Sequence, residues 1–321
     1  MTGRGGLLIV AVAVAGPLSA QPLTRAGGTV ERPGTSAPVP VGNARTVLHR
    51  VGVASQGPID TVMTDAAGRF QFEFRADSAS SYLISARHAG IEYFSAPLGT
   101  NRARPDTGIH LLVYDTSATA PVVTKSRTLV LGAPDVTGSR TVIDWFVLEN
   151  RGTRTRVGRD STESTWAARL PAGVRGPEVG DARLSQISAE AVTFRDDTAF
   201  VSAPISPGQK ELLLQYEVVK DQRSLELPLG QVDSVDLFIE ETGLGPDPAR
   251  WRVRDSQMFE GRPFRRFQRL GLVPTLTIRF PRTSLPRAVL PVLVSLIGVG
   301  LFGGAWVLMR RPGHARPASP S

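Results

Sequence analysis

The sequence predicts an all-β protein with two β-sandwich domains and one C-terminal transmembrane helix. Short apolar runs separated by Gly, Pro, Asp and Ser recur along most of the chain, and helical periodicity is scarce. Residues 288–309 contain no charged side chain, and residues 7–15 form a shorter apolar run near the N-terminus. These three observations divide the chain into a leader, a β-rich body and a membrane anchor.

Residues 1–20 are typical of a secretory signal peptide. Arg4 lies in a charged first region, residues 7–15 form the apolar region, and small residues follow as far as Ala20. We expect cleavage after Ala20, although Leu18 is larger than the residue preferred two places before a cut. The chain has no cysteine, so neither a lipoprotein anchor nor a disulfide framework is possible.

Residues 288–309 have the length and composition of a single membrane span. A helix of this length covers roughly 33 Å, against a hydrocarbon core of ~30 Å. Arginines are equally frequent on both sides of the span, so charge alone does not orient it. A cleaved signal sends the preceding domains outward. We therefore expect a single-pass protein of the cell membrane, with an extracytoplasmic body and a short cytoplasmic tail over residues 310–321.

The body between leader and span is predicted to consist of strands in two series. The first comprises a strand around Leu48 and the segments Phe70–Phe74, Tyr82–Ala86 and Ile109–Tyr114. The second comprises Thr141–Glu149, Trp166–Leu170, Ala191–Phe194, Leu212–Val219 and Val235–Glu240. Strict alternation in the first phenylalanine-rich segment places three phenylalanines on one face of a half-buried strand. The segment 203–208 cannot be a central strand, because its two prolines lack a donor.

Within the first series, one motif is more specific. Thr64–Phe70 reads Thr-Asp-x-x-Gly-x-Phe, where Asp65 can hydrogen-bond its own turn and Gly68 can adopt a positive φ. Phe70 then enters the core. Together with Asn43, the strand Tyr82–Ala86, Gly90 and Tyr93, this motif makes residues 26–115 resemble the carboxypeptidase regulatory-like family, whose sandwiches are related in shape to transthyretin. The resemblance implies a fold and an accessory role, and Asp65 is expected to be a turn residue. The three prolines of segment 32–40 leave its first strand poorly defined.

The second domain is expected over residues 122–282. Its segments Asp144–Asn150, Arg169–Gly173 and Leu212–Tyr216, the last preceded by Pro207 and Gly208, resemble a companion domain found beside such modules in membrane-anchored bacterial envelope proteins. That resemblance implies no particular activity.

No catalytic, cofactor or metal site is predicted. Without cysteine, thiol chemistry and thiolate metal sites are excluded, and the four histidines have no ligand spacing. The acidic pairs Asp196-Asp197 and Glu240-Glu241 are interpreted as turn and rim charges, because neighbours on a strand point to opposite faces. Gly298–Gly303 fits a dinucleotide-binding pattern, but it lies inside the predicted span with no strand before it.

Two features are candidates for binding. Four arginines of the basic, aromatic segment 250–269 are a candidate surface for anionic lipid headgroups or an acidic envelope polymer: Arg262, Arg265, Arg266 and Arg269. The alternative, which we favour, makes them the solvated edge of a structural strand. Gly300 and Gly304 have the spacing of a helix-packing motif within the span.

The sequence therefore indicates a non-enzymatic, membrane-anchored bacterial envelope protein with binding or assembly modules. An accessory subunit of a larger membrane complex and an extracytoplasmic hydrolase with an unrecognised site are the alternatives. The formal charge of +8 comes almost entirely from arginine, and an exported protein rarely meets nucleic acid, so no nucleic-acid partner is expected. The expected partners are the membrane and an envelope protein, lipid or polymer; the sequence assigns neither a ligand nor an oligomeric state.

Overall fold

The computed structural model describes residues 23–53, 55–99, 105–219, 223–259, 261–269 and 273–280. The chain divides into two compact units, Met1–Val113 and Tyr114–Ser321. Strands dominate both, and across the described ranges no helix is long and apolar enough to span a bilayer. The predicted signal peptide (1–20), span (288–309) and tail (310–321) lie outside the described residues, as do Gly300 and Gly304.

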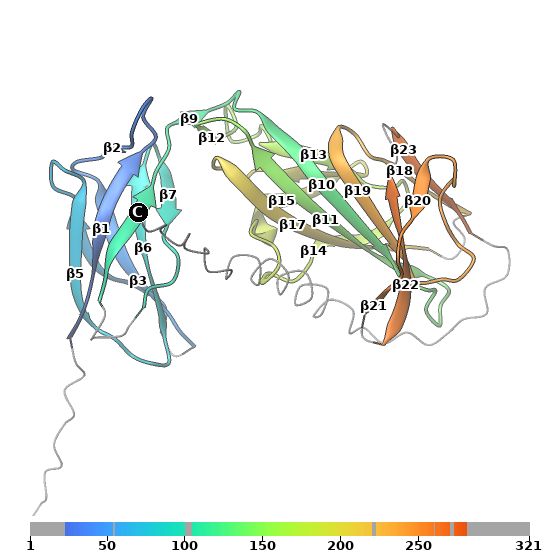
Figure 1. Ribbon diagram of the computed structural model, residues 1–321, viewed down its shortest axis with the longest axis horizontal. Coiled ribbons are helices and arrows are strands. Elements are labelled where there is room, and N and C mark those ends of the chain that lie inside the picture. The colour runs from blue at the N-terminus through green and yellow to red at the C-terminus, as the bar shows by residue number, and fades with distance from the viewer. Residues whose placement is uncertain are drawn as a thin grey trace, which may run out of the picture. The chain divides into compact units, whose positions relative to one another are not determined.

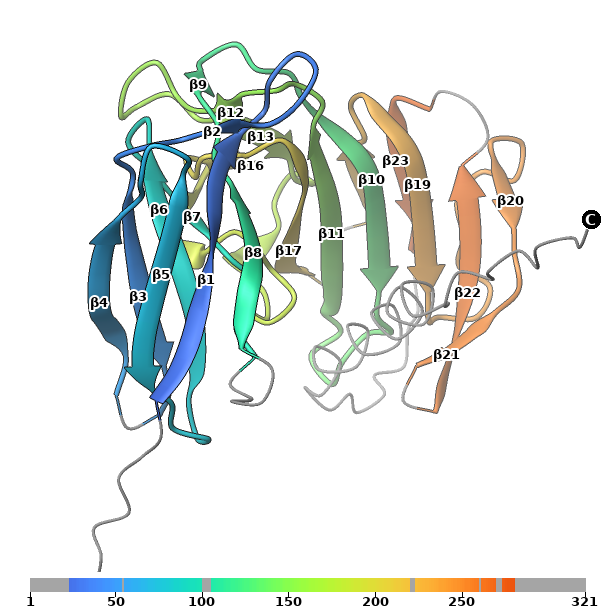
Figure 2. The ribbon, with the colours of Figure 1, turned by 60° about the vertical axis from the view of Figure 1, so that its left-hand side comes forward.

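The first unit is built from two β-sheets (Figures 1 and 2). Its strands are β1 (Leu23–Arg32), β2 (Val39–Pro40), β3 (Arg45–Val51), β4 (Gly57–Met63), β5 (Arg69–Arg75), β6 (Ser81–His88), β7 (Ile91–Phe94) and β8 (Asp106–Leu112). In one sheet, β1 pairs antiparallel with β5 and, at its C-terminal end, with β2, and it pairs parallel with β8. The second sheet has the order β4-β3-β6-β7. The Phe74 and Tyr82 rings, 4.8 Å apart, join the two sheets across the core.

The phenylalanine strand behaves as predicted. All three phenylalanines of β5 are buried while the residues between them are exposed. The first strand differs from the prediction, because β1 lies upstream of the proline-rich segment and already begins at Leu23. It accommodates β8 through Gly28, where an added Cβ would lie 1.9 Å from the carbonyl oxygen of Ile109. Glycine is therefore required at this close approach between parallel strands.

The second unit is also all-β. Its elements are β9 (Thr116–Ser117), β10 (Val122–Leu131), β11 (Arg140–Asn150), β12 (Thr155–Arg156), β13 (Trp166–Arg169), β14 (Arg175–Val179), the 3-10 turn η1 (Ala189–Ala191), β15 (Val192–Arg195), β16 (Thr198–Val201), β17 (Gly208–Val218), β18 (Ser224–Pro228), β19 (Val232–Ile239), β20 (Trp251–Val253), β21 (Gln257–Phe259), β22 (Arg262–Arg269) and β23 (Thr275–Arg279). The largest sheet has the order β14-β17-β11-β10-β19-β22-β20, with β21 paired to β22.

A second layer covers one face of this large sheet, and it is divided into two small sheets. One has the order β13-β16-β15 and the other consists of β18 and β23 (Figure 2). Leu170, Val201, Leu227 and Ile278 from this layer share one buried core with residues such as Leu129 of the large sheet. Among the described residues, β13, β18 and β23 each pair with a strand along one edge alone. The second layer is therefore made of two separate small sheets with open edges between and beside them.

Candidate functional site

The four predicted arginines all lie on β22, but they do not form one surface. Phe264 of this strand packs in a small apolar cluster on one face of the large sheet, whereas Phe267 packs in the main core on the other face. Because alternate residues share a face, the arginines divide into two pairs. These pairs are Arg262 with Arg266, and Arg265 with Arg269.

Each pair already has partners within the unit. Arg262 Nη1 lies 3.0 Å from Glu240 Oε1, and Arg266 Nε lies 2.9 Å from Asp236 Oδ1. Both arginines are only partly exposed. Their charges are therefore largely balanced by Asp236 on the neighbouring strand β19 and by Glu240 directly after it.

The other pair contacts aromatic and backbone groups. The Arg265 guanidinium lies 5.0 Å from the centre of the Phe267 ring, a cation–π contact. Arg269 Nη2 donates to the carbonyl of Val232, and burial lowers the pKa of this guanidinium. These contacts match the structural interpretation of the arginines; binding of headgroups or polymer stays a prediction.

A buried polar cluster lies at the centre of the second unit and was not predicted. Arg127 of β10 donates from Nε to Asp144 Oδ1 at 2.9 Å and from Nη2 to Asp144 Oδ2 at 2.6 Å. The Tyr216 hydroxyl donates to the same carboxylate at 3.2 Å. The exposed fraction is 2% for the arginine side chain and 0% for the carboxylate. Burial raises the pKa of Tyr216 well above its usual range, so this hydroxyl stays a donor.

This cluster forms because three adjacent central strands direct polar residues into the core. Strand β11 pairs with β10 on one side and β17 on the other. Asp144 has the same parity as Val142 and Phe146, whose side chains face the main core. The sequence signal was available: a single carboxylate interrupts the apolar run Val142–Leu148. The pairing of β10 with β11 is needed to identify Arg127 as the cation that pairs with this carboxylate.

Arg127 also forms the floor of a recess of about 420 Å³ between β13 and the turn after β18. Its Nη1 donates to the carbonyl of Pro228 at 3.0 Å, and its Nη2 approaches that of Arg169 at 3.4 Å. Phe146 and the half-buried Trp166 line the same recess, with ring centres 5.1 Å apart. Because the Arg127 guanidinium is already bonded to the chain itself, the recess offers an aromatic wall and backbone groups, with the exposed Arg169 also in its lining.

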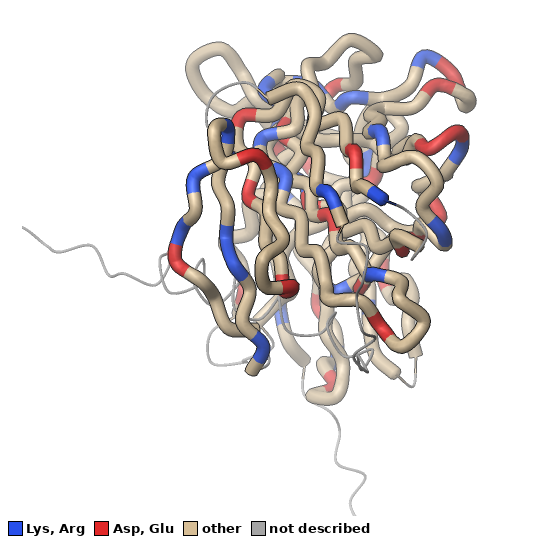
Figure 3. Tube along the Cα trace, turned by 90° about the vertical axis from the view of Figure 1, so that its right-hand side faces the viewer, with Lys and Arg blue, Asp and Glu red and all other residues tan. Residues whose placement is uncertain are grey.

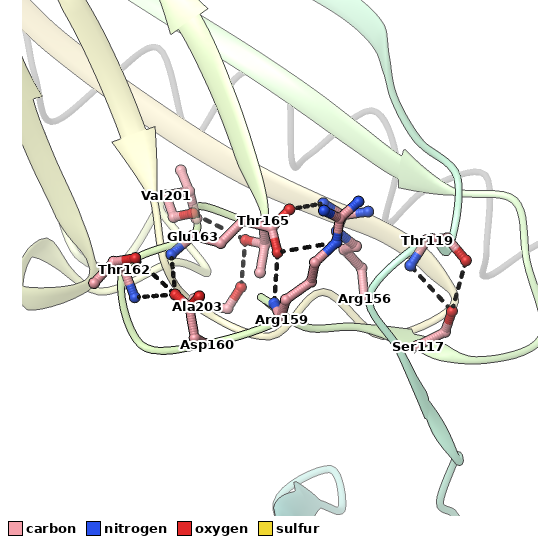
Figure 4. Close-up of polar contacts among 10 residues, drawn as sticks. All are labelled: Ser117, Thr119, Arg156, Arg159, Asp160, Thr162, Glu163, Thr165, Val201 and Ala203. Carbon is pink, nitrogen blue, oxygen red and sulfur yellow. Dashed lines mark hydrogen bonds and ion pairs between the residues drawn. The ribbon is translucent and has the colours of Figure 1, made fainter.

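The polar loop between β12 and β13 is a second candidate (Figure 4). Asp160 Oδ1 accepts from the backbone and hydroxyl of Thr162 at 2.8 and 2.7 Å, and this hydroxyl lowers the pKa of Asp160. Glu163 accepts the backbone N–H of Arg159 and lies 3.6 Å from Arg156. Both carboxylates therefore stabilise their own loop, and no acid or base is left poised for catalysis there.

The remaining polar residues singled out from the sequence have structural roles. Asp65 Oδ1 accepts from the backbone N–H groups of Ala67 and Arg69, and Gly68 has a φ of +72°, so the predicted turn is confirmed. Asp196 and Asp197 both have positive φ in the turn between β15 and β16. Turns of this kind favour short polar residues, and the interpretation as turn charges is confirmed.

The second acidic pair also behaves as interpreted. Glu240 contacts Arg262, while Glu241 accepts from Arg140 at 2.8 Å, so the two neighbouring carboxylates have different partners. Within the described ranges, no group of three or more His, Asp or Glu residues is arranged to hold a metal ion. Figure 3 shows acidic and basic positions next to one another along several of the same loops.

No protein-family model and no curated protein matches the chain. Two solved structures of BcpA, the major pilin subunit of Bacillus cereus, are matched at very low similarity. A single-substitution variant is 12% identical with a TM-score of 0.20, covering 75% of this chain and 81% of the pilin. The unsubstituted pilin is 8% identical with a TM-score of 0.21, covering 84% and 98% respectively. Similarity at this level establishes no relation to the pilins.

Proposed function

We propose that this protein is a non-catalytic binding or assembly module, held at the outer face of a bacterial cell membrane. The observation that carries the binding role is the divided second layer of the second unit. It leaves open strand edges beside two concave surfaces, the recess over Arg127 and a groove along β23. Open edges present unpaired backbone donors and acceptors, which suit recognition of another chain.

The membrane location is supported by sequence. The leader over residues 1–20 and the apolar stretch 288–309 flank the body, and a short tail follows. The first unit, with its Asp65 turn and alternating β5, is consistent with an accessory sandwich of the carboxypeptidase regulatory-like type. Such a domain supplies a rigid spacer or docking surface rather than chemistry.

A hydrolase is a weaker second candidate. The one fully buried ionisable cluster found among the described residues, Arg127–Asp144–Tyr216, is internally satisfied and faces the core. A catalytic group needs access to substrate and an uncommitted proton or lone pair. An accessory subunit of a membrane complex would use the same open edges. It would differ from the main proposal in being a permanent member of the complex.

Protease treatment of spheroplasts tests the location. We expect digestion of the body and survival of a short, membrane-held C-terminal fragment. Protection of residues 25–280 together with cleavage of the tail would reverse the proposed orientation.

Photo-cross-linking in intact cells tests the binding role. A photoreactive residue at Ala167, exposed on the β13 edge, should give a discrete adduct. The same residue at Gln71, exposed on β5, an edge strand of the first unit, should not. Equal labelling at both positions would contradict a specific surface on the second unit.

A further inference from the structure

A groove of about 660 Å³ runs along the outer edge of β23. Thr275, Thr277 and Arg279 line one side, and all three are exposed. The segment from Gly245 to Trp251, which leads into β20, lines the other side. Figure 1 shows β23, β18 and β20 at the same end of the second unit. The groove therefore lies where the edges of the two layers separate.

The backbone of β23 directs its free hydrogen-bonding groups into this groove. Strand β23 pairs antiparallel with β18, and the pairing is extended by the bonds Leu229 N–H to Pro274 O and Phe280 N–H to Arg223 O. In an antiparallel ladder, bonded positions alternate along a strand. Leu276 and Ile278 consequently bond to β18, whereas the N–H and C=O groups of the three exposed residues between and beside them point to the open edge.

We propose that the groove binds an extended, acidic segment of a partner polypeptide, which pairs with β23 as an additional strand. This inference rests on the proposed binding function and specifies its partner. Main-chain hydrogen bonds supply the affinity in recognition of this kind, and alternate side chains supply the specificity.

The dimensions and chemistry of the groove suit a strand better than a compact small molecule. The five residues of β23 span about 17 Å at ~3.3 Å per residue. The opposite wall contains Pro246 and Pro248, which have no N–H group and therefore cannot donate to the β23 edge. The centre of the edge carries Thr277, and its charged residue, Arg279, lies at the end of the strand, so the middle of the edge has neither charge nor proline to oppose an added strand.

The charge of the groove favours an acidic partner. Its lining contains Arg250 and Arg279 against one carboxylate, Asp247. The Arg250 Nε lies 4.0 Å from Asp247 Oδ2, and both side chains are largely exposed. Arg279 has no ion pair with a described acidic residue. An acidic side chain beside β23 would therefore meet an uncompensated positive charge.

Binding is tested with the full chain in detergent micelles and a set of seven-residue peptides that alternate Thr and Val, with Glu at each position in turn. Isothermal titration calorimetry measures the affinity. Replacing Glu with Lys in the best peptide should weaken binding about two- to fivefold at low salt, and the difference should shrink as salt rises.

The decisive variant is Thr277→Pro. It removes a donor that faces the groove and no bond to β18, and proline is tolerated on an edge strand in this orientation. We expect at least a tenfold loss of peptide affinity, with the melting temperature nearly unchanged. Glu226→Pro is the matched control, because its N–H also points away from the β18–β23 ladder but on the side opposite the groove. It should retain peptide affinity.

Three results would overturn the inference. These are absence of binding by every peptide, equal losses in Thr277→Pro and Glu226→Pro, or peptide-independent dimers that Thr277→Pro abolishes. The last would mean that a second copy occupies the edge. If no peptide binds but the spheroplast and cross-linking experiments give the expected results, only the assignment of the groove is wrong. If the body is instead protected from protease in spheroplasts, the proposed function is wrong as well.

Discussion

The two units of this protein have differently built cores. In the first, the three phenylalanines of β5 are buried, Phe74 packs against Tyr82 of the facing sheet, and the core side of β5 carries no charge. In the second, an arginine and a carboxylate lie fully buried between the layers. The first core is stabilised by apolar burial, which is non-directional, whereas the second depends on mutually satisfied hydrogen bonds. Loss of one group should therefore have different consequences in the two units.

The largest effect is expected from Asp144→Ala. It leaves the Arg127 charge buried without its carboxylate, which costs about 3–5 kcal/mol. Exchanging both partners for apolar residues, Arg127→Met with Asp144→Leu, should cost less than Asp144→Ala alone, although Pro228 O then loses its donor. Chemical denaturation followed by tryptophan fluorescence measures this, because no tryptophan lies in the first unit. Additive losses in the double variant would mean that the two groups do not act as a pair.

Phe72→Ala is the corresponding deletion in the apolar core. The side chain is 1% exposed, so its removal should cost about 3–5 kcal/mol through lost burial and the cavity left behind. Scanning calorimetry should show a lower transition temperature for the first unit and an unchanged one for the second. A change in tryptophan fluorescence at the same temperature would show that the units unfold together.

The contrast also explains what the sequence could predict. Strict alternation in Phe70–Phe74 was enough to place that strand and its buried face, and the Asp65 turn needed only local geometry. For Asp144, the sequence predicted a place in a strand but no partner. Its partner Arg127 comes from a neighbouring strand 17 residues away, and no local rule pairs them.

The prediction for the arginines of β22 was limited in the same way, because it also depended on how the strands assemble. Their spacing in sequence is dense, but strand parity sends Arg262 and Arg266 to one face and Arg265 and Arg269 to the other. The open edge of β23 was also hidden, because strand order is a property of the complete sheet. Local pattern therefore predicted the strands, whereas the candidate surfaces depended on their assembly.

Glycine substitutions sharpen the description of the first unit. At Gly68 an added Cβ would lie 2.6 Å from the carbonyl oxygen of Val30, and φ is +72°. At Gly90 φ is +82°, but no atom lies within 4 Å of that Cβ position. Gly90→Val should cost roughly 1–3 kcal/mol through backbone strain alone, and Gly68→Val should cost more. Equal losses in thermal unfolding would mean that the Val30 contact relaxes freely.

Smaller effects are expected from the arginines of β22 in the second unit. Arg262→Gln with Arg266→Gln removes two partly exposed ion pairs, each worth about 0.2–1 kcal/mol. We expect the wild-type protein to show no binding to added anionic vesicles through these residues, even at low salt. Vesicle flotation with and without all four Gln substitutions measures this. Salt-sensitive flotation that the substitutions abolish would instead establish the headgroup site.

The smallest effect should be a pH dependence carried by the solvated end of β11, outside both cores. Hydrogen bonds from Arg151 and Lys125 lower the pKa of Glu149 from 4.5 to about 2. A carboxylate with a depressed folded-state pKa stabilises the protein above its unfolded pKa, and that contribution is lost as the pH falls toward about 2.

Glu149→Gln should therefore reduce the decline in stability of the second unit between about pH 4.5 and 2, while leaving the pH dependence of the first unit unchanged. Denaturation midpoints measured across this range, with tryptophan fluorescence for the second unit and calorimetry for the first, provide the test. Because the carboxylate is partly exposed, the change should be small and should decrease with added salt. An undiminished pH dependence in the variant would assign the acid sensitivity to other carboxylates of the unit.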